Sequence, residues 1–292
     1  MKIIKASNLT CPIDEKPLEA HEKQLGCGNG HTFDIARQGY VNLLPVQHKR
    51  SKSPGDSKEM VSARTRFLNA GIYKPVANKL AEIVSAQING DTDTCLLDAG
   101  CGEGYYLNDI LNHLKTKDGK GDLSFIGLDI SKPAIAEAAK RNKQITWIVG
   151  TNRQPPIACA SVDIIVCVFG FQSFEGFSNV LKPGGKVILV EPGPDHLKEM
   201  REVIYAEVKK SDPQEISGDN TTGFQVVDTQ PLHFKTSAIN AEHIQDLLLM
   251  TPHFYRASQE GRAAAGQLKE LNLTVDMVFR TLENWNSEEL HS

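Results

Sequence analysis

The chain lacks any run of apolar residues long enough to cross a bilayer, and it shows no signal-peptide pattern. A membrane-spanning helix needs about 20 consecutive apolar residues, so the sequence predicts a soluble, cytoplasmic protein without a membrane partner. Its six cysteines do not form a disulfide framework. Internal repeats and low-complexity tracts are absent too. What is left is a chain of 292 residues, long enough for a full α/β core and an appendage.

Positive charge is scarce as well, with a formal net charge of −4. That balance argues against a generally basic nucleic-acid coat but not against a local one. The first 60 residues hold nine Lys and Arg against seven Asp and Glu, so the remainder carries −6. A basic run at 48–52 contains Lys49, Arg50 and Lys52. Such a run is either a solvated linker or a place for phosphate contacts from a folded RNA.

The most informative segment that is present is 96–106, an apolar strand that runs into a glycine-rich turn and then a helix. Asp98 ends the strand, where open α/β sheets bind their ligands. Three glycines follow at alternate positions and let the backbone approach a ligand without a Cβ in the way. A second apolar strand ends in Asp129, whose carboxylate can accept both hydroxyls of a ribose. The two strand ends together predict a nucleoside-bearing cofactor.

The glycine spacing decides between nucleoside cofactors. A dinucleotide fingerprint would need a third glycine where Tyr105 or Leu107 stands. The pattern D-x-G-x-G-x-G instead resembles S-adenosylmethionine-dependent methyltransferases of the Rossmann-like class. The predicted contacts with the cofactor, from its methionine end to its adenine, are Asp98, Gly100, Gly102, Glu103, Gly104, Asp129, Thr151 and Asn152. The last two also fit a plain strand–helix loop.

From residue 95 onward, short apolar strands alternate with helical patterns, which favours a parallel, doubly wound sheet. Strands are predicted at 95–99, 124–129, 145–149, 162–168 and 185–191, and helices near 105–115, 132–141, 173–181 and 194–209. Segments 231–237 and 272–280 would add a final antiparallel pair, and the polar stretch 211–230 is typical of a mobile surface insertion. The predicted fold class is therefore α/β, a Rossmann-like methyltransferase fold with a small N-terminal domain.

The N-terminal segment carries two short clusters of metal-ligand residues, C-P-I-D at 11–14 and C-G-N-G-H at 27–31. Their separation suits a zinc ribbon, in which Cys and His hold tetrahedral Zn²⁺. A segment of about 30 residues builds little core, so a metal would stabilise it. The predicted ligands are Cys11, Asp14, Cys27 and His31, with His21 as a less well placed substitute. The alternative is a lobe held by hydrophobic packing, with zinc weakly bound or absent.

Longer motifs resemble the RlmA family, methyltransferases that act on a guanine N1 of large-subunit ribosomal RNA. Across residues 9–256 they are C-P…C-x-x-x-H-x-F-D-x-A-R-x-G-Y-V-N-L-L-P-V-Q, P-G-D-S-x-E-M-x-x-A-R-x-x-F-L-x-x-G-x-Y, D-x-G-C-G-E-G-Y-Y and P-G-P-x-H-L. The resemblance implies a zinc-bearing lobe that recognises RNA (1–36), a basic linker (37–65), a methyltransferase domain (66–292) and a homodimer. It also implies that Tyr73 and His196 contact the cofactor. Asp14 departs from the family pattern, which normally has a cysteine there.

Methylation at guanine N1 requires loss of the N1 proton, so a carboxylate, imidazole or ordered water is expected within hydrogen-bond reach. The sequence names no catalytic base, and Glu191 and Gln172 are the candidates near strand ends. Phe169 or Phe171 would stack a guanine that has left its own stack, although core aromatics are common at strand ends. Two other functions stay open from the residues alone: methylation of a small metabolite, and RNA binding without catalysis.

Overall fold

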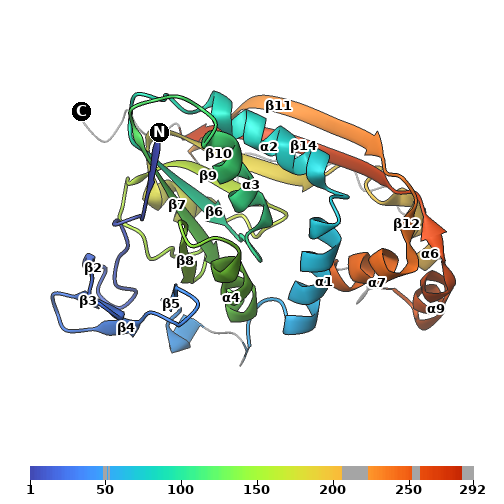
Figure 1. The fold of residues 1–292 in the computed structure, drawn as a ribbon, viewed down its shortest axis with the longest axis horizontal. Helices are drawn as coiled ribbons and strands as arrows, with labels where there is room; N and C mark the ends of the chain where they lie inside the picture. Colours follow the sequence, from blue (N-terminus) through green and yellow to red (C-terminus); the bar gives the residue numbers. More distant parts are fainter. Residues whose placement is uncertain (49–50, 52, 206–222, 252–256, 285–292) are drawn as a thin grey trace.

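One nine-stranded sheet organises the computed structural model of the protein (Figure 1). The structure describes residues 1–48, 51, 53–205, 223–251 and 257–284. The parallel strands at its centre are β6 (Thr94–Ala99), β7 (Asp122–Asp129), β8 (Thr146–Val149), β9 (Val162–Val168) and β10 (Leu181–Pro192). Two antiparallel strands, β14 (Thr274–Asn284) and β11 (Phe224–Lys235), extend it beyond β10. The strand order is β11-β14-β10-β9-β6-β7-β8-β5, in which β5 is Tyr40–Asn42, and β1 (Lys2–Ile4) also pairs with β7.

Strand β6 lies at the centre of this order, and all of its residues are buried. Parallel strands covered on both faces are apolar throughout, which is why the run at 95–99 could be recognised in the sequence. The chain builds outward from β6 to β7 and β8, and then returns to β9 on the other side of β6. Open α/β sheets bind ligands at such a reversal of strand order.

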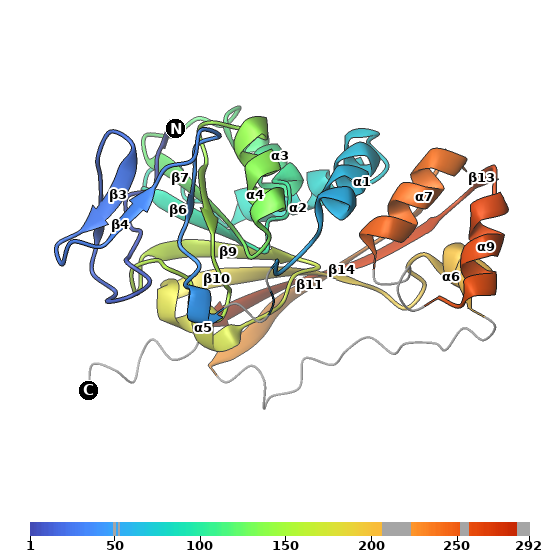
Figure 2. The same ribbon diagram turned by 90° about the horizontal axis from the view of Figure 1, so that it is seen from below.

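Helices cover both faces of the sheet (Figure 2). The helices on one face are α1 (Lys58–Asn69), α2 (Lys74–Ala86), α3 (Tyr105–Leu114) and α4 (Lys132–Arg141), whereas α5 (Phe174–Val180) lies on the other. Serine caps begin two of them: Ser57 accepts from the Met60 amide at α1, and Ser131 from the Ala134 amide at α4.

The predicted alternation of strands and helices is confirmed, and so is the final antiparallel pair. Helix α6 (Lys198–Ile204) begins later than the predicted start at 194, because the chain first passes through Pro194 and the left-handed Leu197. The predicted insertion is wrong for 224–230, which belong to β11. Its residues 211–222 lie outside the described residues.

The N-terminal residues contribute both to the sheet and to a separate lobe. Strand β1 (Lys2–Ile4) pairs with β7, and β5 (Tyr40–Asn42) pairs with β8. Between them, β2 (Leu18–Ala20), β3 (Gln24–Cys27) and β4 (Thr32–Asp34) form a three-stranded antiparallel sheet, the N-terminal lobe. The predicted linker 37–65 thus contains β5, the short 3-10 helix η1 (Val46–His48) and the first part of α1. Its basic residues Lys49, Arg50 and Lys52 lie outside the described residues.

A helical cluster lies at the end of the molecule away from the N-terminal lobe (Figures 1 and 2). It contains α6, α7 (Ala241–Met250) and α9 (Gln259–Gln267), beside the short pair β12 (Ile239–Asn240) and β13 (Glu270–Leu271). Helix α7 packs on α1, where Arg66 pairs with the buried Asp246. None of the helices in the described part of the chain is long and apolar enough to cross a membrane.

Candidate active site and metal centre

The glycine turn after β6 lies at the reversal of strand order. Gly100 and Gly102 have positive φ (95° and 55°), which side chains with a Cβ rarely adopt. The Gly100 amide donates to the Leu128 carbonyl (2.8 Å) and fastens the turn to the end of β7. A Cβ on Gly100 would lie 3.5 Å from the Cα of Gly170 in the loop after β9. The turn and that loop therefore border one site.

Asp98 is buried beneath this turn, with 1% of its surface exposed. Its Oδ1 atom has no hydrogen-bond partner among the described residues. Burial raises the pKa of Asp98 well above its usual value, and the carboxylates of Asp129 and Glu103 raise it further. A buried carboxyl group without a hydrogen-bond partner stays neutral unless a cation pairs with it. The ammonium and sulfonium groups of S-adenosylmethionine are cations of this kind.

Asp129 ends β7 and holds the turn from the other side. Its Oδ2 accepts from the Gly102 amide (2.9 Å), and its Oδ1 accepts from the Ser131 amide (2.7 Å). Burial raises the pKa of Asp129, while these two hydrogen bonds oppose the rise. Each carboxylate oxygen can accept a further hydrogen bond. Asp129 can thus bind ribose hydroxyls while it also fixes the backbone around them.

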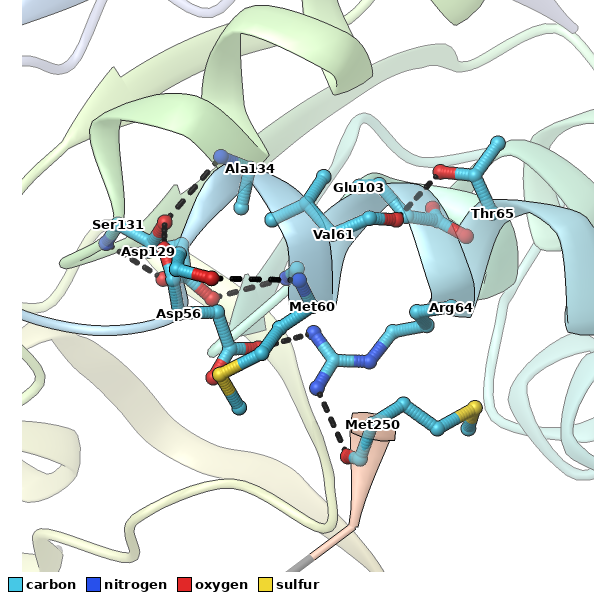
Figure 3. Close-up of polar contacts among 12 residues, drawn as sticks. Asp56, Met60, Val61, Arg64, Thr65, Glu103, Asp129, Ser131, Ala134 and Met250 are labelled. Carbon is cyan, nitrogen blue, oxygen red and sulfur yellow. Dashed lines mark hydrogen bonds and ion pairs between the residues drawn. The ribbon is translucent and has the colours of Figure 1, made fainter. Parts of the chain in front are cut away.

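The chain just before and within α1 closes over this turn (Figure 3). Asp56 forms an ion pair with Arg64, whose Nη2 also donates to the Met250 carbonyl (3.4 Å). The Asp56 carbonyl accepts from the Ser131 hydroxyl (2.8 Å). Gly55 (φ 81°) packs so closely that a Cβ would come within 2.8 Å of the Ser131 side chain. Sequence reasoning missed these roles, although the P-G-D-S and A-R motifs marked the residues.

Two of the predicted cofactor residues face the protein interior. Gly104 has φ of 80°, and a Cβ there would lie 2.6 Å from the Trp147 ring. Glu103 accepts from the Tyr105 amide (2.8 Å) and lies 3.4 Å from the Arg141 guanidinium. Burial raises the pKa of Glu103, and Arg141 opposes this rise. Packing explains why Gly104 occupies its position, and the contacts with Tyr105 and Arg141 explain Glu103. Their contact with a cofactor remains a prediction.

Tyr73 and His196 lie together, although they are far apart in the sequence. The Tyr73 hydroxyl is 3.3 Å from His196 Nε2, and the tyrosine ring packs edge-on against Phe67. Complete burial raises the pKa of Tyr73 far above its ordinary value. The His196 ring also stacks with Phe169, with centroids 6.4 Å apart and planes 14° apart. These rings connect the start of α2 with the loop after β9.

The loop after β8 borders the same place. Asn152 Nδ2 donates to the Phe171 carbonyl (2.8 Å), and Thr151 Oγ1 accepts from the Arg153 amide (3.3 Å). The Arg153 guanidinium lies over the Phe171 ring, 4.7 Å from its centroid. Phe169 and Phe171 are 46% and 57% exposed, so they are not core aromatics. Exposed rings beside the glycine turn offer faces on which a nucleobase can stack.

Gln172 and Glu191, the two candidates for the proton acceptor, are hydrogen-bonded to each other. Gln172 Nε2 donates to Glu191 Oε1 (3.0 Å), and Glu191 Oε2 forms an ion pair with Arg280 of β14. Both oxygens of Glu191 therefore have partners. Sequence reasoning missed Arg280, because its place beside Glu191 depends on the antiparallel pairing of β10 with β14.

The N-terminal lobe brings the four predicted metal ligands together, with ligand atoms all within 4.8 Å of one another. His31 Nδ1 is 3.5 Å from Cys11 Sγ, 3.4 Å from Cys27 Sγ and 3.1 Å from Asp14 Oδ2. Tetrahedral zinc with bonds of about 2.0–2.3 Å separates its ligands by about 3.3–3.8 Å. The cluster thus matches zinc in size and donor type. His21 is not part of it.

The lobe is fastened to the loop after β8. The Thr10 amide donates to the Pro156 carbonyl (3.0 Å), and Gln154 Nε2 donates to Glu15 Oε1 (3.2 Å). The same loop contains Asn152, which bonds to the Phe171 carbonyl. The loop after β8 therefore contacts both the N-terminal lobe and the loop that carries Phe169 and Phe171.

Comparisons with known proteins agree with the metal cluster in the N-terminal residues and with the glycine turn in the central sheet. The family description "RlmA, N-terminal" matches residues 9–52, and "Methyltransferase domain" matches residues 96–185. The chain is 28% identical to the putative 23S rRNA (guanine-N(1)-)-methyltransferase YxjB of Bacillus subtilis (strain 168), over 93% of this chain and 95% of that protein. It is 33% identical to the 23S rRNA (guanine(748)-N(1))-methyltransferase of Streptomyces fradiae over 66% of each chain. It is 35% identical to a putative 23S rRNA (guanine-N(1)-)-methyltransferase of Micromonospora griseorubida, over 66% of this chain and 68% of that protein.

Proposed function

We propose, since this chain belongs to the RlmA family of 23S rRNA (guanine-N1)-methyltransferases, that it methylates a guanine N1 in a hairpin of large-subunit ribosomal RNA. The observation that carries the proposal is the close approach of two loops: Gly100 of the glycine turn lies beside Gly170 of the loop after β9, which carries Phe169 and Phe171. The turn suits a nucleoside cofactor, and the loop offers ring faces to a base. The metal cluster of the N-terminal lobe and the similarity to 23S rRNA methyltransferases favour this function over methylation of a small metabolite or RNA binding alone.

When bound, S-adenosylmethionine would supply an electrophilic methyl group to guanine N1, with the methyl C–S bond breaking as the N1–C bond forms and the N1 proton passing to water. In this assignment Asp98 would face the positive charge of the cofactor, and Asp129 would accept from the ribose hydroxyls. Tyr73 and His196, which lie 3.3 Å apart at the start of α2 and in the chain after β10, would border the cofactor. The reaction is a displacement at one carbon, so fixed positions for donor and acceptor supply much of the rate.

The target guanine has to leave its stack to reach the methyl group. Phe169 and Phe171 are the surfaces proposed to receive it. Phe169 has φ of 54°, a conformation that costs a non-glycine residue about 1–3 kcal/mol. Its stacking on His196 and the pairing of its amide with the Val190 carbonyl (3.1 Å) hold it there.

Zinc, RNA recognition and assembly complete the proposal. Zinc would be held by Cys11, Asp14, Cys27 and His31, whose spacing supports a tetrahedral site. The N-terminal lobe and the basic run at 48–52 would bind the RNA backbone, and two copies of the chain would form a homodimer around an RNA-binding cleft. The enzyme would act in the cytoplasm, together with the ribosomal RNA that it methylates.

Nucleoside mass spectrometry of ribosomal RNA from a strain without this protein tests the function. We expect N1-methylguanosine to fall in the large-subunit RNA, and primer extension to show which guanine is affected. The wild-type gene should restore the mark, whereas Asp98→Ala should not. Unchanged N1-methylguanosine, together with no methylation of a hairpin fragment by the purified protein, would refute the proposal.

A further inference from the structure

Gln172 is held in one orientation at the border of the site. We propose, resting on the function proposed above, that its carbonyl oxygen accepts a hydrogen of the 2-amino group of the target guanine and so selects guanine. Glu191 and Arg280 are then positioning residues that act through Gln172.

The orientation is set by an ion pair between neighbouring strands. Across β10 and β14, Glu191 pairs with Val278 and Leu189 pairs with Arg280. Glu191 and Arg280 are therefore diagonal neighbours on one face of the sheet. Each side chain is 14% exposed. A largely buried ion pair keeps its geometry, because breaking it would leave a buried charge without a partner.

This ion pair decides which end of the Gln172 amide faces Glu191. An ionised carboxylate only accepts hydrogen bonds, so the amide nitrogen must face Glu191 Oε1, as it does at 3.0 Å. A reversed amide would set two acceptors against each other. This is the amide's single hydrogen bond within the described part of the chain. Its carbonyl oxygen is thus left to accept from a ligand.

The backbone beside Gln172 packs against the glycine turn after β6. A Cβ on Gly170 would lie 2.9 Å from the Ala99 carbonyl, and the Phe171 carbonyl accepts from Asn152. The neighbouring ring of Phe171 is 57% exposed. A base stacked on that ring presents its edge to the side chains around it, and Gln172 is the next residue along the chain.

The edge of guanine differs from that of other purines in its amino group. Guanine carries the N2 amino donor, which adenine and hypoxanthine lack. An acceptor bound to this group leaves N1 free to face the methyl donor. Sites built to bond a donor group reject analogues without it, because the site's own polar atom is then unpaired. A neutral amide oxygen does not take up the N1 proton, so Gln172 acts in selection and not as a base.

Single-turnover methylation of a hairpin fragment with guanosine or inosine at the target position tests this role, because inosine lacks only the 2-amino group. We expect the wild-type protein to methylate guanosine about tenfold faster, the effect of one hydrogen bond. Gln172→Ala should bring this ratio close to one without changing the Kd for the cofactor. Gln230→Ala is the matched control, because Gln230 also donates to a carboxylate (Asp228, 2.6 Å) but on the exposed strand β11.

The positioning residues have their own variants. Glu191→Gln can donate to Gln172, lets its amide reverse, and should lower the ratio. Arg280→Ala should lower it too, and Arg280→Lys should restore part of it. A wild-type ratio near one, or an unchanged ratio in Gln172→Ala, overturns the inference while the proposed function stands. A wild-type protein that methylates neither fragment, together with unchanged N1-methylguanosine in ribosomal RNA of the strain without it, refutes the proposed function, and this inference with it.

Discussion

At the scale of single residues, the unpaired carboxyl of Asp98 makes stability depend on pH. Burial, then Asp129 and Glu103, raise its pKa in the folded protein, whereas an unfolded Asp has a pKa of about 3.9. Its contribution to stability is therefore fully present below about pH 4 and is lost as pH rises through the raised value. We expect the free energy of unfolding without cofactor to fall across that window, and less so in Asp98→Asn. Urea titrations at a series of pH values measure this.

The exposed Asp34→Asn is the control for that experiment, and it should follow the wild type. Cofactor binding, measured by calorimetry in buffers of different ionisation enthalpy, should release a proton from the wild type within the same window. Equal pH profiles for wild type and Asp98→Asn would show that Asp98 is not the titrating group.

Gly104 offers a second prediction at this scale. Alanine there meets both the strain of φ 80° and the Trp147 ring at 2.6 Å, which together should cost about 2–5 kcal/mol. Gly71 is a matched control, because it has the same φ of 80° but nothing within 4 Å of an added Cβ. Gly71→Ala should therefore cost only the strain, about 1–2 kcal/mol. Denaturant unfolding of both variants gives the difference, and equal losses would exclude a steric role of Trp147.

The sequence was a good guide to residues whose role follows from their place on a strand. Asp98 and Asp129 end apolar strands, and the four metal ligands lie in two short clusters. Residues whose role depends on tertiary contacts could not be found in this way. Gly104, at the start of α3, packs against Trp147 of β8, and Arg280 reaches Glu191 only through strand pairing.

At the scale of elements, the proposed zinc site in the N-terminal lobe includes an unusual ligand, Asp14. Carboxylate oxygen is a harder ligand than thiolate, so Asp14→Cys should slow the transfer of zinc to a chromogenic chelator. Asp14→Ala removes a ligand and should weaken zinc by at least the roughly 10–100-fold seen for outer-shell partners. Asp34→Ala, on the exposed part of β4, is the control. Absence of zinc from gently purified protein with an ordered lobe would contradict the assignment.

The predicted elements also show what the sequence can reveal about the fold. Strands β6 to β10 have apolar runs between turn residues, so their period and length are readable. Strands β1 and β5 have three residues each, too few for any period. Their place beside β7 and β8 follows from pairing alone, so the sequence predicts a linker for residues 40–42 and not a strand.

At the scale of the whole molecule, charge is divided between the two ends of the chain. Replacing Lys49, Arg50 and Lys52 with alanine should reduce methylation of an rRNA fragment and leave cofactor affinity unchanged. Each lost phosphate contact should lower the slope of log affinity against log salt by about one. Alanine at the exposed Lys117, Lys120 and Lys269 is the control. Normal methylation by the first variant across a range of salt would mean that the run is only a tether.

The path of the chain through β1, the N-terminal lobe and β5 has a consequence for how a long substrate is measured. The lobe leaves the central sheet beside β7 and returns to it beside β8, so it is anchored at both ends like a bracket on a wall. Two attachment points restrict the position of the lobe relative to the sheet more than a single one would. An RNA bound by this lobe, as proposed above, would therefore reach the glycine turn at a fixed distance along its backbone. The modified position would then be set by that distance as well as by the sequence of the RNA.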